Sequence, residues 1–291
     1  MSIHQESFSS PRRAASFGAC LAISSLLFLA GNGSAQIVSL TSGGSTAAVD
    51  LGSSAGMYNW TVNGQDQLNQ QWFWYQANGG AVQPINTIAN PSVLNGGLSY
   101  TLASPNQLDA YYYNDQLSID VLYTLKGGGV GSGGADITEQ IMVINQSSSV
   151  LSLNFYQYSN FNLLGAANDN VEIFNSGGKY NSVRQWNGST AIEETVASPS
   201  ADYAEAAYYS LSGFNPSPSG PLNNNLTAGP GNVTWAFEWC STLAANGGEF
   251  DLTKDKSLSI AVVPEPGTTA AAVFGGLCLM GWTARRRRSA S

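Results

Sequence analysis

Short apolar runs bounded by glycine, asparagine and proline recur through the middle of the chain, and this punctuation is typical of strands and turns. Apolar and polar positions alternate in two consecutive segments, residues 136–145 and 150–163. In the first segment, Ile137, Ile141 and Val143 fall on one face. We therefore predict two half-buried strands, joined at the short Gln-Ser-Ser sequence by a hairpin turn.

The most pronounced apolar face is predicted between residues 233 and 239, near the end of the middle part of the chain. After it, a Gly-Gly pair at 247–248 predicts a turn, and the segments 249–253 and 257–262 predict a returning strand. We therefore expect a hairpin here, with the large side chains in the core. The residues of that face are Val233, Trp235, Phe237 and Trp239.

Two segments depart from the strand pattern. Residues 127–134 are nearly all glycine, which predicts a mobile loop or a flexible hairpin tip. Ser198 and Pro199, followed by residues 201–211 and a glycine at 213, carry the start and stop signals of one short helix. The pattern as a whole predicts an all-β fold, an antiparallel, jelly-roll-like β-sandwich formed by one domain over residues 36–262.

The first 35 residues show the three parts of a secretory signal peptide. Arg12 and Arg13 supply the positive start, residues 17–30 form the apolar centre, and a Gly-Ser-Ala sequence precedes Gln36. We predict cleavage before Gln36 and therefore export of the protein.

The last segment, residues 263–291, contains an uncharged apolar run followed by four consecutive arginines. Residues 267–284 are long enough to form a minimal transmembrane helix of roughly 27 Å at 1.5 Å per residue. The positive charge fixes its orientation, because such clusters stay on the cytoplasmic side. The arginines of this cluster are Arg285, Arg286, Arg287 and Arg288.

An extended, proline-fixed segment precedes this span, where a protease would have access. The sequence Val263, Pro264, Glu265, Pro266, with the apolar run and the terminal arginines, resembles the PEP-CTERM sorting signal of bacterial envelope proteins. The resemblance implies an exosortase as partner, transient anchoring in the inner membrane, and delivery to the cell surface or extracellular space. It also implies a structural or adhesive role in exopolysaccharide or biofilm assembly.

Charge and cysteine content narrow the function classes. Residues 36–262 hold five Lys and Arg against seventeen Asp and Glu, a net charge of −12, which argues against binding to nucleic acid. Cys240 is alone in this region, so no internal disulfide can form there. A small, partly buried Cys240 is favoured over a reactive thiol.

The only histidine, His4, lies in the signal peptide. The exported part therefore has no Ser-His-Asp or Cys-His system and no usual zinc site. From this we expect a non-enzymatic protein with no metal and no cofactor.

Two alternatives remain open. The aromatic runs at 72–75 and 111–113 could form a stacking surface for an extracellular polysaccharide, although alternate residues of a strand point inward. The candidates for this carbohydrate-binding surface are Trp72, Trp74 and Tyr75. A pair of carboxylates could instead hydrolyse glycosides without histidine. The candidate acids are Glu193, Glu194, Asp202, Glu205 and Glu238.

Oxygen ligands suited to calcium occur at Asn168, Asp169, Asn170 and Glu172, and at Asp109 with Asp115. Neither group has the spacing of a calcium-binding loop, so solvated turn residues are the favoured interpretation.

Overall fold

A computed structural model describes residues 36–90, 92, 95–165, 167–209 and 221–260. The predicted signal peptide, the Val-Pro-Glu-Pro motif, the predicted membrane helix and the arginine cluster lie outside these residues. Within them, no helix is long and apolar enough to cross a membrane.

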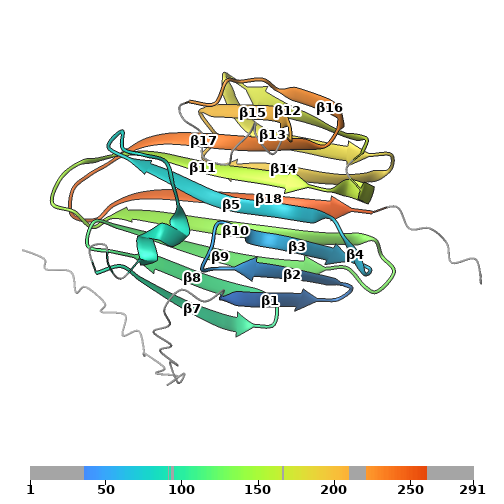
Figure 1. The fold of residues 1–291 in the computed structure, drawn as a ribbon, viewed down its shortest axis with the longest axis horizontal. Coiled ribbons are helices and arrows are strands. Elements are labelled where there is room, and N and C mark those ends of the chain that lie inside the picture. Colours follow the sequence, from blue (N-terminus) through green and yellow to red (C-terminus); the bar gives the residue numbers. More distant parts are fainter. Residues whose placement is uncertain (1–35, 91, 93–94, 166, 210–220, 261–291) are drawn as a thin grey trace, which may run out of the picture. The chain divides into compact units, whose positions relative to one another are not determined.

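The described part of the chain is nearly all β, with two short 3-10 helices, η1 (Ile85–Ala89) and η2 (Leu163–Gly165), and no α-helix. Its strands form two nine-stranded sheets, which we name sheet A and sheet B (Figure 1). The strands pair antiparallel, except for one short parallel contact between β3 and β5. The predicted all-β sandwich is therefore confirmed.

Sheet A contains the strands nearest the N-terminus together with three later ones. Its order is β1 (Ile37–Ser42), β2 (Ser45–Asp50), β3 (Gly56–Val62), β5 (Leu68–Ala77), β11 (Leu151–Phe161), β17 (Val233–Leu243) and β15 (Tyr203–Tyr208), with β4 (Gln65–Asp66) beside β3 and β6 (Gln83–Pro84) beside β5.

Sheet B contains two runs of sequential neighbours joined through β18. Its order is β16 (Thr227–Gly231), β12 (Asp169–Ser176), β13 (Lys179–Asn187), β14 (Thr190–Ser198), β18 (Gly248–Ser259), β10 (Gly134–Asn145), β9 (Leu117–Gly127), β8 (Gln107–Tyr113) and β7 (Gly97–Ser104).

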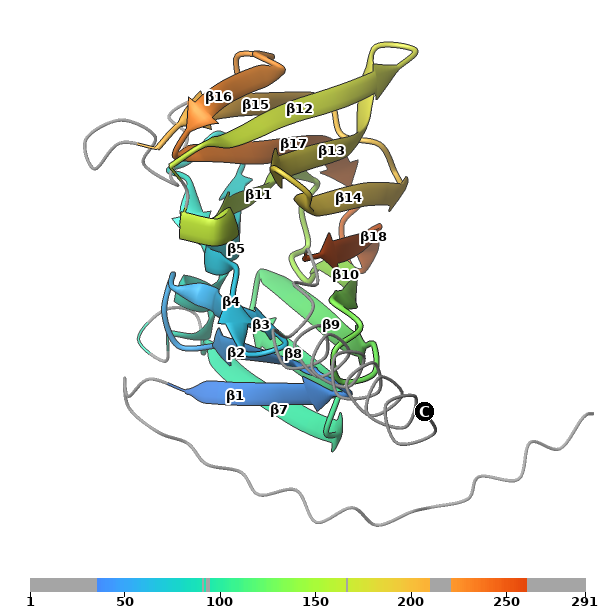
Figure 2. The same ribbon diagram turned by 90° about the vertical axis from the view of Figure 1, so that its right-hand side faces the viewer.

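The predicted strand faces are correct, but two predicted hairpins are not. β10 and β11 fall in opposite sheets, and so do β17 and β18. Figure 2 shows β5 and β11 facing β10 and β18 across the sandwich. The two short connections therefore carry the chain from one layer to the other. Alternation specifies which face of a strand is buried, and both arrangements bury the same face, so the pattern could not distinguish them.

The predicted helix over residues 201–211 is wrong. Tyr203–Tyr208 form strand β15, which pairs with β17 along the edge of sheet A. Ala204 and Ala206 are buried on one face of this strand. Pairing with an existing sheet outweighed the local helix signals, as tertiary contacts commonly do.

The glycine-rich segment is a hairpin tip, one of the two predicted alternatives, since β9 and β10 pair up to Gly127 and Gly134. Its backbone packs directly on the tip of the β1–β2 hairpin, where the Gly44 amide donates to the Gly128 carbonyl at 2.9 Å. A Cβ at Gly127 would lie 1.8 Å from the Ser42 carbonyl oxygen. Glycine here permits a close approach of two backbones.

We expect the Gly127→Ala variant to lose about 1–3 kcal/mol of unfolding free energy, because the added methyl overpacks the contact between the two tips. Gly129→Ala is the matched control, since a Cβ there meets nothing within 4 Å. Urea unfolding of both variants measures the difference. Equal stability of the two variants would contradict the close packing.

Candidate functional site

The structure does not support the predicted sugar platform on β5. Trp72 is 0% and Trp74 2% exposed, and Tyr75 is only partly exposed. Trp72 packs edge-on against Tyr112, with ring centroids 6.2 Å apart. These rings belong to the core, so Trp72, Trp74 and Tyr75 cannot offer a stacking surface, and that prediction is wrong.

The candidate glycosidase acids do not form a site. Glu194 lies between the sheets and Glu238 is also fully buried. Glu193 is exposed beside Arg184, and Glu205 accepts the Asn223 amide at 3.2 Å. Glu193 and Glu194 are neighbours on β14 whose side chains lie on opposite faces, and Glu205 and Glu238 lie on β15 and β17. Glu194 and Glu238 are buried, so neither can pair with an exposed acid across an open cleft.

The candidate calcium ligands likewise do not form a metal-binding site. Asp169 is buried and its Oδ2 accepts hydrogen bonds from the Leu163 amide at 3.1 Å and Gln185 Nε2 at 2.8 Å. The described residues contain no group of three or more His, Cys, Asp or Glu side chains that could hold a metal ion.

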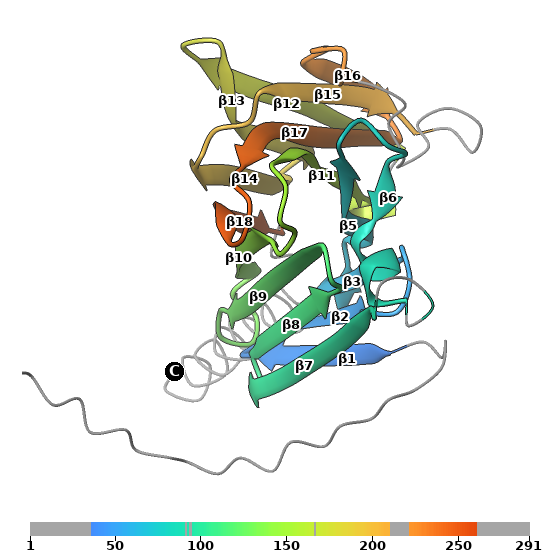
Figure 3. The ribbon, with the colours of Figure 1, turned by 90° about the vertical axis from the view of Figure 1, so that its left-hand side faces the viewer.

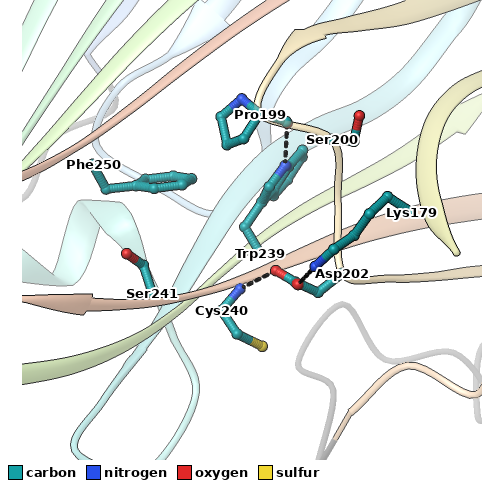
Figure 4. Close-up of a pocket in the computed structure, with 8 residues that line it drawn as sticks. All are labelled: Lys179, Pro199, Ser200, Asp202, Trp239, Cys240, Ser241 and Phe250. Atoms are coloured by element: carbon teal, nitrogen blue, oxygen red, sulfur yellow. Dashed lines mark hydrogen bonds and ion pairs between the residues drawn. The ribbon is translucent and has the colours of Figure 1, made fainter. Parts of the chain in front are cut away.

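One pocket, with a volume of about 370 Å³, lies beside the part of β17 that extends beyond β15 (Figure 4). Lys179 forms an ion pair with Asp202, whose Oδ2 accepts the Cys240 amide at 2.8 Å. Trp239 Nε1 donates to the Pro199 carbonyl at 3.0 Å. We call this the Lys179 pocket, and its lining is Lys179, Pro199, Ser200, Asp202, Trp239, Cys240, Ser241 and Phe250.

The electrostatics of the Lys179 pocket do not favour nucleophilic chemistry. Cys240 is an exposed residue, and not the partly buried one predicted. Desolvation of its thiol and the negative charges of Glu238 and Asp202 raise the pKa of the thiol to about 11, in agreement with the prediction that it is not a reactive thiol. The thiol therefore stays protonated at neutral pH and is a weak nucleophile. The hydrogen bond to Asp202 raises the pKa of Lys179, which stays an ammonium group.

A second arrangement lies on the outer face of sheet B. Tyr111 and Tyr113 project from β8 on the side opposite the buried Tyr112, as strand alternation requires. Their rings stack with centroids 5.4 Å apart and an interplanar angle of 22°. A Cβ at Gly97 would lie 2.4 Å from the Tyr113 ring, so only glycine on β7 lets the ring lie there. Figure 3 shows β7, β8 and β9 side by side on the outside of the sandwich.

Two carboxyl groups lie beside these rings on the same face. Asp120 on β9 stands directly across from Tyr111, and its carboxyl group is hydrogen-bonded to that of Asp109 on β8. Burial, then the hydrogen bond and the charge of Asp109, raise the pKa of Asp120 to about 7. Asp120 therefore keeps its proton up to near neutral pH. We call Asp109, Tyr111, Tyr113 and Asp120 the tyrosine–aspartate face.

The sequence predicts part of this face. The run Tyr111–Tyr113 indicates an aromatic surface with alternate rings pointing inward, and the burial of Tyr112 confirms that alternation. The sequence pattern groups Asp109 only with Asp115 and does not indicate Asp120. The signal that could have found Asp120 is the antiparallel pairing of β8 with β9, which requires knowledge of the register.

A third group of polar residues lies between the sheets. Glu139, Glu194, Lys254 and Lys256 are all 0% exposed, and we call them the interior charged cluster. Glu139 Oε2 lies 2.5 Å from Nζ of both lysines, and Glu194 Oε2 lies 3.4 Å from Lys256 Nζ. Two positive and two negative charges balance each other, as buried ions require. The cluster has no access to solvent, so it is not a binding site for an external ligand.

No protein-family model matches the chain, and no curated protein sequence matches it. Among solved structures, a bacterial glucoamylase complexed with acarbose aligns with a TM-score of 0.50 at 8% identity, over 84% of this chain and 36% of the glucoamylase chain. A protein from Escherichia coli K12 named "Putative aldose 1-epimerase" aligns with a TM-score of 0.50 at 9% identity, over 79% of this chain and 100% of that chain. The chain thus spans only about a third of the glucoamylase. At these identities the likeness concerns the fold.

These likenesses contradict the expectation of a non-enzymatic protein, because this sandwich is found in proteins named for enzymatic activities toward sugars. The absence of histidine from residues 36–262 excludes only catalysis that uses an imidazole group. Carboxyl groups can also transfer protons, and the fold places one with a pKa of about 7 on an outer face. What the comparisons establish for this chain is a β-sandwich fold shared with sugar-related proteins.

Proposed function

We propose that the protein binds carbohydrate on the tyrosine–aspartate face. The observation that carries this proposal is the stacked Tyr111–Tyr113 pair beside the hydrogen-bonded carboxyl groups of Asp109 and Asp120. Aromatic rings pack on the apolar faces of sugar rings, and carboxyl oxygens accept hydrogen bonds from sugar hydroxyl groups. The fold shared with sugar-related proteins supports the same ligand class.

The Lys179 pocket is the weaker location for a sugar. Its aromatic residues, Trp239 and Phe250, are 1% and 8% exposed, whereas Tyr113 is 39% exposed. The charged groups of the pocket also bind one another, since Asp202 accepts from both Lys179 and the Cys240 amide. A ligand there would have to displace these bonds, at a cost in desolvation.

A second candidate function is general acid catalysis on the bound sugar. It is favoured by Asp120, whose pKa of about 7 lies where a carboxyl group can exchange protons at neutral pH. The hydrogen-bonded carboxyl groups are too close for the pair of a standard glycosidase, whose members stand roughly 5 Å or more apart. The candidate chemistry is therefore proton transfer to a sugar oxygen by Asp120 alone.

We further propose that the protein is exported and sorted through its C-terminal signal. The signal peptide, the Val263–Pro266 motif and the arginine cluster support this proposal. An exosortase would process the tail during transient anchoring in the inner membrane, and the domain would then reach the cell surface or the extracellular matrix. Extracellular polysaccharide is the carbohydrate that it would meet there, in an adhesive or biofilm setting.

For the binding proposal, we expect Tyr113→Ala to weaken the affinity for an oligosaccharide about three- to tenfold, as loss of one stacking contact predicts. Tyr100→Ala is the matched control, because Tyr100 is also 39% exposed but lies on β7 with its side chain on the opposite face. Isothermal titration with a panel of soluble oligosaccharides measures both. If no sugar binds, or if both variants bind equally well, the proposal is wrong.

For the acid role, we expect the rate of sugar mutarotation or hydrolysis to fall as the pH rises through about 7, because only the protonated Asp120 donates a proton. Asp120→Asn should abolish this pH-dependent rate. Asp109→Asn should move the fall to lower pH, since it removes a charge that raises the pKa of Asp120. Polarimetry and reducing-sugar assays between pH 5 and pH 9 provide the measurement. A rate profile that is the same in all three proteins would exclude the role.

For the sorting proposal, we expect pulse-labelled full-length protein to be shortened in cells that contain an exosortase and to keep its tail in cells that lack one. A Pro264→Ala and Pro266→Ala double variant should remain unprocessed in both. Persistence of the intact tail in both strains would refute processing by an exosortase, and carbohydrate binding would be unaffected.

A further inference from the structure

The side-chain amine of Lys254 lies in an enclosed and partly aromatic environment between the sheets. Its Nζ donates a hydrogen bond to Oε1 of Gln157, which belongs to β11 in the facing sheet. Glu139 Oε2 lies 2.5 Å from the same Nζ, and the centroid of the Phe73 ring lies 4.7 Å from it. Lys254, Glu139 and Gln157 are each 0% exposed, so this contact excludes water.

The amide nitrogen of Gln157 is hydrogen-bonded as well. Its Nε2 donates to Glu194 Oε2 at 2.8 Å and to Ser159 Oγ at 3.1 Å. The amide group thus lies between an amine on one side and a carboxylate on the other. These are the parts that an amide exchange requires, namely a nucleophile at the carbonyl, a base at the nucleophile and a proton carrier at the departing nitrogen.

We propose that Lys254 and Gln157 form an intramolecular isopeptide bond that links sheet B covalently to sheet A. Glu139 accepts one proton from the Lys254 ammonium group, and the free amine attacks Cδ of Gln157. The bond from Cδ to Nε2 then breaks, the second proton lost by Nζ passes to Nε2 by way of Glu194, and ammonia leaves. The products are a secondary amide and one ammonia molecule, with one proton retained on Glu139, so no oxidant or cofactor is needed.

The balance between burial and neighbouring charges favours reaction at Lys254 over Lys256. Burial lowers the pKa of Lys254 to about 8, which makes the free amine accessible near neutral pH. At Lys256, burial is outweighed by the charges of Glu139 and Glu194, and the pKa is raised. Lys256 also has an amide neighbour, with its Nζ 3.4 Å from Gln71 Oε1. Because Lys256 stays an ammonium group, it is the internal comparison that should not react.

The link would serve an exported domain that has no disulfide of its own. Cys240 is the only cysteine in residues 36–262, whereas the proposed bond joins two residues that are 97 positions apart in the chain. Closing such a long loop restricts the unfolded chain, as a disulfide does. This inference is independent of carbohydrate binding, and either can fail without the other.

Peptide mapping of the purified, folded full chain by tandem mass spectrometry tests the proposal. The expected result is a branched peptide that contains residues 157 and 254, lighter than its two parts by one ammonia molecule and uncut by trypsin after Lys254. Intact mass alone does not decide, because cyclisation of an N-terminal Gln36 or of an Asn-Gly sequence also releases ammonia. Recovery of unlinked peptides with unmodified Lys254 and Gln157 from the folded protein overturns the proposal.

Three variants test the chemistry. Lys254→Met should lack the branched peptide, and Gln157→Glu should either leave the residues unlinked or form the link with loss of water in place of ammonia. Glu139→Gln should slow or prevent linkage while Lys254 and Gln157 are retained. Circular dichroism confirms that each variant folds. Should a variant not fold, the map of the wild-type protein still decides, and a branched peptide that persists in Glu139→Gln at the wild-type yield refutes the role of Glu139.

Discussion

Four charged side chains buried between two sheets impose the main constraint on this fold. An ion removed from water must meet a partner, because an unpaired charge in the interior costs several kcal/mol. Lys254 and Lys256 on β18 meet this requirement through Glu139 on β10 and Glu194 on β14, the two strands that flank β18. The order and register of the middle of sheet B are therefore tied to the pairing of charges as well as to backbone hydrogen bonds.

Sheet A completes the same network from the opposite side. Gln157 on β11 and Gln71 on β5 point their amides at the two lysines, and Phe73 lies against Lys254. Aromatic packing surrounds this polar centre, as in the stacked Phe73–Phe155 pair with ring centroids 5.7 Å apart. Sliding one sheet over the other would separate charges from amides, so the polar centre specifies how the layers face each other.

Successive residues of a strand point alternately into the closed interior and onto the outer face, where a ligand could contact them. On β8, Tyr112 faces inward and donates a hydrogen bond to the Leu51 carbonyl, whereas Tyr111 and Tyr113 face outward. On β9, Tyr123 lies in the core and Asp120 lies on the outer face beside Asp109. Lys254 and Asp120 both have shifted pKa values, but only Asp120 lies on a face that a sugar can approach.

The sequence by itself determined the strand faces, since a period of two assigns Ile137, Ile141 and Val143 to the core whatever their partners are. It also predicts the export and sorting signals, because such signals are linear features of the chain. Only the tertiary structure decided that β10 and β11 lie in opposite sheets, that residues 203–208 form a strand, and that Trp72 and Trp74 are core residues. The same holds for the pairing of Asp120 with Asp109 and of Lys254 with Glu139 and Gln157. These facts depend on register and on which strands become neighbours, and residues far apart in the chain settle both through contacts that no local pattern encodes.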